Sequence, residues 1–171
     1  MTLANMVGRG LERADTGRDE IARYLTKIRR RIADSKKIGI SLDSRFDIAF
    51  EALLQISLAA LRVNGYRTTS AAGHQQLAIQ LLPKSIGIEP SEIRTLDEFR
   101  KKRSIGLYEA DFDPSEDEVK AVNAAVGRLY EKLVGWIRDN RPDLIKDSGH
   151  GPRKTTQPKP TARPAKPRRR G

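Results

Sequence analysis

The 171-residue sequence contains no cysteine. A disulfide framework, a thiolate zinc site and a cysteine nucleophile are therefore excluded, and packing alone must stabilise the fold. Histidine is also scarce, with only His74 and His150 in the whole chain. Two such distant histidines make a histidine metal site improbable on chemical grounds, so we predict that the protein uses no metal.

Long apolar runs and glycine-rich phosphate loops are missing too. The first ten residues show no signal-sequence pattern, and nowhere do eighteen apolar residues follow one another. The segment Gly8-Arg9-Gly10 has a weak Gly-x-Gly similarity but precedes no predicted strand. We therefore expect a soluble, cytoplasmic protein without membrane contact, without nucleotide hydrolysis and without a cofactor.

Acidic residues are absent from the C-terminal segment between Gly149 and Gly171, which holds eight of the 33 basic residues and five of the nine prolines. The rest of the chain carries 25 basic and 22 acidic residues, so most of the net charge of +11 lies in this segment. We predict that residues 147–171 form a disordered tail, which binds phosphate backbones without reading sequence, through residues that include Arg168, Arg169 and Arg170. A solubilising extension is the alternative.

Apolar residues recur at helical spacing in five segments, and no segment alternates convincingly with period two. The sequence therefore predicts an all-α fold, an antiparallel bundle of about five helices over residues 18–146. Residues 1–17 are Gly-rich and weakly patterned, so we expect them to form a flexible arm. The predicted helices are Arg18–Ser35, an apolar central helix from Ser41 to Asn64, Ser70–Leu82 closed by Pro83, a helix from Ser91 that ends near Gly106 to Ala110, and a last helix that starts at Asp113-Pro114 and stops before Pro142.

Two basic surfaces follow from these helices. The first predicted helix carries Arg23, Lys27, Arg29, Arg30 and Arg31 outside its apolar stripe, and this face is either simply solvated or faces phosphate. The fourth helix ends in four consecutive cations, which repel one another unless an anion compensates. A solvated helix terminus that complements the macrodipole is the alternative. We take the second surface as a candidate nucleic-acid site, formed by Arg100, Lys101, Lys102 and Arg103 together with Arg67.

Two further residues could belong to a polar site. Arg67 and His74 flank the start of the third predicted helix, and we expect them to line one pocket with the basic end of the fourth. His74 is either a hydrogen-bonded structural residue or a general base. Arg103 and Tyr108 are five positions apart, so a continuous helix would separate them, whereas a loosened helix near Gly106 would bring them together.

The chain resembles HEPN domains, specifically small bacterial members, over about residues 18–140. The segments that carry the resemblance are RFDIAFEALLQISLAALRVNGYR, AAGHQQ, LDEFRKKRSIGLYEADF and the helix after DPSEDEV. The resemblance implies an RNA-associated bundle, a homodimer and, in some systems, a nucleotidyltransferase partner that modifies a HEPN tyrosine. Active HEPN ribonucleases pair an Arg and a polar residue with a His four to six residues on. Arg103 and Ser104 match, but Tyr108 stands where His is expected.

Three functions remain open on these grounds. The first is a HEPN-like module that binds RNA or nucleotide with a degenerate nuclease motif, within a toxin–antitoxin or defence pair. The second is a metal-independent ribonuclease in which Arg103, Tyr108 and His74 are catalytic, although a phenol with a pKa of about 10 is a poor acid or base near neutrality. The third is a homodimeric protein-interaction bundle without nucleic-acid function.

Overall fold

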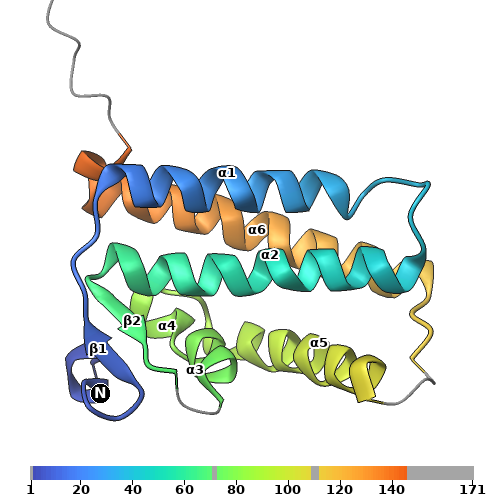
Figure 1. Ribbon diagram of the computed structural model, residues 1–171, viewed down its shortest axis with the longest axis horizontal. Helices are drawn as coiled ribbons and strands as arrows, with labels where there is room; N and C mark the ends of the chain where they lie inside the picture. The colour runs from blue at the N-terminus through green and yellow to red at the C-terminus, as the bar shows by residue number, and fades with distance from the viewer. Residues whose placement is uncertain (1, 71–72, 109–111, 146–171) are drawn as a thin grey trace, which may run out of the picture.

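Residues 2–70, 73–108 and 112–145 are described by a computed structural model. Four long helices dominate this part of the chain: α1 (Arg18–Asp34), α2 (Leu42–Val63), α5 (Pro90–Tyr108) and α6 (Glu116–Asn140). Successive long helices run back and forth across the molecule (Figure 1). The predicted all-α class is confirmed, with one small β-ribbon added.

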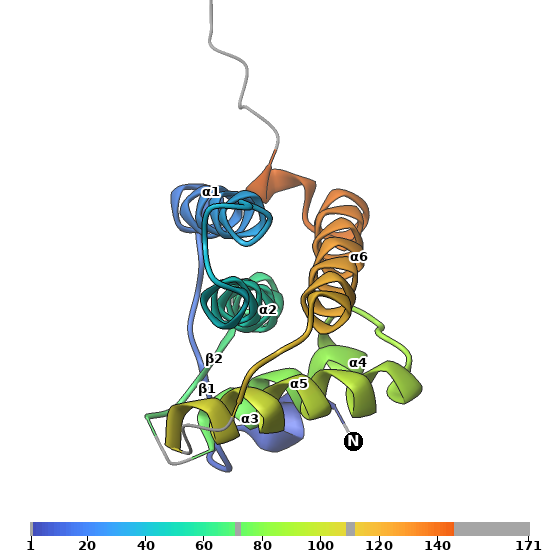
Figure 2. The same ribbon diagram turned by 90° about the vertical axis from the view of Figure 1, so that its right-hand side faces the viewer.

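The core forms around α2, which packs against both α1 and α6 and lies above the layer of α3, α4 and α5 (Figure 2). Because apolar residues occupy several faces of α2, this helix is buried from several sides, as its sequence predicted. Phe46, Phe50, Leu53 and Ile56 are almost completely buried there. Phe46 also meets the rings of Phe99 and Phe112 edge-on, which ties α5 and the segment before α6 to the centre.

Both predicted boundaries of the third helix are wrong. The third helix begins only at His74, since Gly73 adopts a left-handed conformation with φ +80°. This helix is α3 (His74–Gln80), and a second short helix, α4 (Leu82–Ser85), follows it. Pro83 lies in the first turn of α4, so it begins this helix and does not end the previous one. The N–H groups of a first turn have no acceptor within the helix, and proline, which lacks an N–H, therefore fits there.

The last helix is capped by Ser115 and not by Asp113. The Ser115 hydroxyl accepts a hydrogen bond from the Glu118 N–H at 3.2 Å, while the Glu118 carboxylate accepts one from the Ser115 N–H at 2.9 Å. This reciprocal capping box satisfies two backbone donors at once. Pro114 consequently precedes the cap, where it is buried.

The expected flexible arm at residues 1–17 is also wrong, because residues 2–17 pack onto the bundle. A 3-10 turn, η1 (Leu3–Met6), leads into β1 (Leu11–Arg13), which pairs antiparallel with β2 (Tyr66–Thr68). Leu3 and Leu11 are buried in a second apolar cluster that also contains Leu61, Ala78 and Leu81. Three-residue strands are too short to show period two in a sequence, which explains why the ribbon was not predicted.

The predicted tail, residues 147–171, lies outside the described residues, which end at Ile145 after η2 (Pro142–Leu144). Among the helices described, none combines the length and the apolar character needed to cross a lipid bilayer.

Candidate nucleic-acid interface

The cations at the end of α5 have acidic neighbours. Arg100 donates to Asp97 at 2.7 Å, and the Lys101 ammonium lies 3.2 Å from the other carboxylate oxygen of Asp97. Lys102 reaches across to Glu118 at the start of α6, at 2.5 Å. Arg100 and Lys102 hold the pKa values of Asp97 and Glu118, respectively, below their ordinary values through these hydrogen bonds. Much of the positive charge that the sequence placed here is thus neutralised within the fold.

Arg103 turns toward α2. Its guanidinium lies over the Phe50 ring, 5.2 Å from the ring centroid, and its Nε is 3.6 Å from an Asp47 carboxylate oxygen. That distance exceeds a hydrogen bond, and the buried Nε has no hydrogen-bond partner in the described part of the chain. Burial raises the pKa of Asp47 despite the opposing charge of Arg103. Arg103 therefore packs mainly as a cation on an aromatic face.

The three predicted catalytic residues are not brought together. Position 108 follows position 103 on an uninterrupted α5, so the two lie about 140° apart around the helix. The expected loosening near Gly106 does not occur, and the Tyr108 side chain lies outside the part that is described. His74 borders a pocket that includes Leu58 of α2, whereas Arg103 contacts Phe50, about 12 Å earlier along that helix axis.

Arg67 and His74 do line one pocket, as predicted, but without the basic end of α5. This pocket has a volume of about 510 Å³ and lies where α1, α2, β2 and the start of α3 meet. Arg67 forms an ion pair with Glu12, the residue opposite it in the β-ribbon, so its charge is balanced locally. The remaining lining consists of residues of both charge signs, hydroxyls, one phenol and one apolar side chain: Glu20, Tyr24, Leu58, Arg62, Thr68, Thr69 and Ser70.

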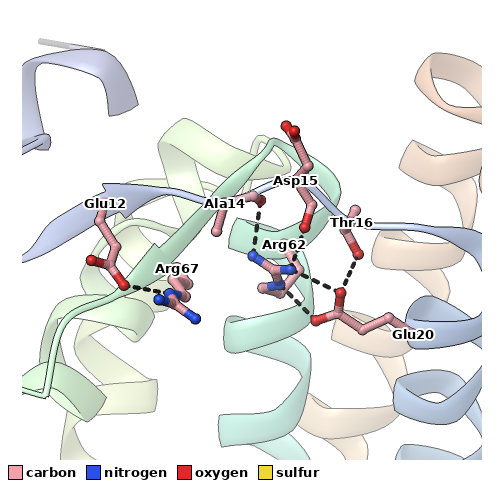
Figure 3. A network of polar contacts seen from close by, with 7 residues as sticks. All are labelled: Glu12, Ala14, Asp15, Thr16, Glu20, Arg62 and Arg67. Atoms are coloured by element: carbon pink, nitrogen blue, oxygen red, sulfur yellow. Dashed lines mark hydrogen bonds and ion pairs between the residues drawn. The ribbon is translucent and has the colours of Figure 1, made fainter.

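Arg62 forms the network drawn in Figure 3. Its guanidinium donates to both carboxylate oxygens of Glu20, at 2.7 and 2.8 Å, and to the carbonyls of Ala14 and Asp15, at 2.9 and 2.7 Å. Thr16 extends the network by donating its hydroxyl to the Glu20 carboxylate at 2.8 Å. Arg62 keeps the pKa of Glu20 below the ordinary value, chiefly through the hydrogen bond. From the sequence, Arg62 was only a charge that interrupts an apolar run; its partner Glu20 is 42 positions away.

The basic face of α1, which was the weaker of the two candidate surfaces in the sequence, carries cations that form no ion pair with the described residues. Arg23, Lys27 and Arg30 are exposed along the outer side of α1, and they border an open depression of about 410 Å³ with Ala22 and Thr26. Within the described residues none of these three cations forms a hydrogen bond or an ion pair with an acid. Arg31, by contrast, pairs with Glu51 at 2.6 Å. We call Arg23, Lys27 and Arg30 the α1 cation face.

A third depression, of about 430 Å³, lies where α1 and α2 pack together and connects the α1 cation face with the 510 Å³ pocket. It is bordered by Arg23 and Lys27 of the α1 cation face, by Gln55 of α2, and by Glu20 and Tyr24. Glu20 and Tyr24 also border the 510 Å³ pocket, so the two hollows adjoin at these side chains. We call the two hollows together the Tyr24 groove. The tyrosine is half-buried, packs on the main core, and has its pKa raised by burial.

Comparison of the chain with protein-family models, with curated proteins and with solved structures yields no match. The resemblance to HEPN domains therefore stays a prediction from the sequence.

Proposed function

We propose that this chain is an RNA-associated helical module in which the α1 cation face holds the phosphate backbone. The observation that carries the proposal is the exposure of Arg23, Lys27 and Arg30, none of which forms an ion pair with an acid within the described residues. Like charges three and four positions apart on a helix repel one another, and a phosphate backbone relieves this repulsion. Binding would release counterions from the RNA and would weaken steeply as salt rises.

Two other cationic segments add to this surface in the proposal. The sequence from Gly149 to Gly171, with eight basic residues and no acid, supplies attraction that is independent of RNA sequence. The stretch Arg100–Arg103 contributes less than its charge suggests, because Asp97, Glu118 and Asp47 compensate it. The choice of RNA over other polyanions follows the HEPN resemblance.

The test is fluorescence anisotropy with a labelled single-stranded RNA of twelve nucleotides at several salt concentrations. Replacing Arg23, Lys27 and Arg30 by Gln removes three phosphate contacts, so the slope of log K against log salt should flatten by about 2. The matched control replaces Arg100, Lys101 and Lys102 by Gln, an equal loss of charge from cations that already have acidic partners. For this control variant, the slope of log K against log salt should change by less than half as much as for the α1 variant.

Removal of residues 149–171 completes the design. This truncation should weaken binding to all sequences alike, and the α1 variant should lower what remains. The proposal is rejected if the full chain binds no RNA at low salt, or if the α1 and α5 variants lose the same affinity.

A homodimer, a place in a toxin–antitoxin or defence pair, and a nucleotidyltransferase that acts on Tyr108 remain predictions from the resemblance. A ribonuclease built from Arg103, Tyr108 and His74 has less support than RNA association, because Arg103 and His74 lie against different parts of α2. The interaction-bundle alternative gains no specific support either. The large apolar side chains that are exposed among the described residues lie on separate elements: Val7, Ile38 and Ile105.

A further inference from the structure

Building on the proposed function, we infer that the RNA is bound as a single strand, with one base inserted into the Tyr24 groove while its phosphates lie on the α1 cation face. The inference rests on the continuity of the two surfaces. Arg23 and Lys27 border both the open depression on α1 and the α1–α2 hollow that contains Tyr24. A phosphate and the base of the same nucleotide therefore have adjacent places on the protein.

The groove has the size of a small-molecule site. Its two hollows measure about 510 and 430 Å³, within the range of roughly 300–1,000 Å³ that is usual for such sites. A duplex keeps the faces of its bases inside the stack and exposes only base edges, sugars and phosphates. Inserting a base from a duplex would require unpairing and unstacking, so the groove favours a strand whose bases are already free.

The charges inside the groove fit a neutral base better than a second phosphate. Glu20 is compensated by Arg62, and Arg67 is compensated by Glu12. Four of the hydrogen bonds that the Arg62 guanidinium donates go to Glu20, Ala14 and Asp15, which leaves little capacity for an anion. The unpaired positive charge lies at the α1 edge of the groove, where Arg23 and Lys27 border both the α1–α2 hollow and the open depression. This division matches the chemistry of a nucleotide, which has an uncharged base and a charged backbone.

The side chains at the groove supply recognition without demanding one particular base. An aromatic ring beside a cationic track is the combination that binds single strands, because every base has a face that can stack. Tyr24 provides the ring, and the Gln55 amide can both donate to and accept from a base edge. The bonds from Arg62 and Thr16 hold Glu20 in place beside the ring, so the wall of the groove is fixed before the ligand arrives.

The experiment compares three labelled ligands on the full chain: single-stranded RNA, the duplex of the same sequence, and a ribose-phosphate strand of equal length without bases. We expect the single strand to bind about tenfold more tightly than the baseless strand, as for one stacked base. Tyr24→Leu keeps apolar volume against the core but removes the ring, and it should reduce single-strand affinity to that of the baseless strand. Duplex affinity should not change.

Tyr130→Leu is the matched control, since this tyrosine of α6 is also half-buried against the main core but lies outside the groove. If Tyr24→Leu fails to fold, Gln55→Ala alters the same groove from a partly exposed position and should lower single-strand affinity severalfold. Equal binding of all three ligands, with Tyr24→Leu and Gln55→Ala unchanged, would overturn the inference and leave the proposed function intact. Absence of binding to every ligand would instead refute the proposed function itself.

Discussion

Arg62 connects three parts of the chain that are distant in sequence. Its side chain is only 11% exposed, and it binds the carboxylate of Glu20 on α1 and two carbonyls of the N-terminal segment. Because these acceptors would lose their partner together, Arg62→Ala should lower the free energy of unfolding by about 2–3 kcal/mol, less than for a fully buried pair since Glu20 is 31% exposed. Urea unfolding at neutral pH measures this loss.

The same variant has a predicted pH dependence. The lowered pKa of Glu20 means that its ion pair stabilises the fold above the ordinary value of 4.5 and that this stabilisation is lost as the pH falls further. The difference in the free energy of unfolding between the wild type and Arg62→Ala should therefore become smaller as the pH falls below about 4.5. As a control, Arg67→Ala removes an exposed pair with Glu12 and should cost less than about 1 kcal/mol. Similar losses for the two variants would contradict the role assigned to Arg62.

At the scale of elements, the start of α6 can be tested by substituting its two candidate N-cap residues, Ser115 and Asp113. Ser115 forms a reciprocal capping box with Glu118, so Ser115→Ala should cost about 1 kcal/mol of stability. Asp113 looked like the cap in the sequence, but it is exposed two residues earlier and Asp113→Ala should change stability by less than about 0.5 kcal/mol. Thermal or urea unfolding of the two variants decides the matter, and a larger loss at Asp113 would refute the observed boundary.

The charge balance of an element also depends on its neighbours. The α5 cations lie beside Asp97 on their own helix and beside Glu118 and Asp47 on others, whereas the cations of the α1 cation face form no ion pair within the described residues. A run of four basic residues was the more conspicuous signal in the sequence. Asp97 is a local partner at helical spacing, but the partners from α2 and α6 are not predicted by any local sequence pattern.

At the scale of the whole molecule, the N-terminal segment is part of the fold. Leu11 is fully buried in the second apolar cluster, so Leu11→Ala should lower the free energy of unfolding by about 2–5 kcal/mol. Val7, in the same segment, is 39% exposed, and Val7→Ala should have a much smaller effect. Urea denaturation again provides the measurement. A flexible arm would instead make both substitutions nearly neutral.

The helical architecture could be predicted from the sequence because helix formation depends on local spacing. Apolar residues at three- and four-residue steps, such as Val119, Val122 and Val126 of α6, are indeed buried. The candidate site could be predicted only in part. Arg67 and His74 share a pocket as expected, but the pocket closes on Arg62 and Glu20 and not on the α5 cations.

The sequence by itself therefore determined which segments are helical, which of them is central, and where the net charge of the chain is concentrated. These properties depend on neighbouring residues and on composition. The tertiary structure decided which charges are compensated, which N-terminal residues are buried, and which side chains of α1 and α2 meet around Tyr24. Those properties depend on pairs as far apart as Glu20 and Arg62, whose contact exists only after α1 and α2 have packed.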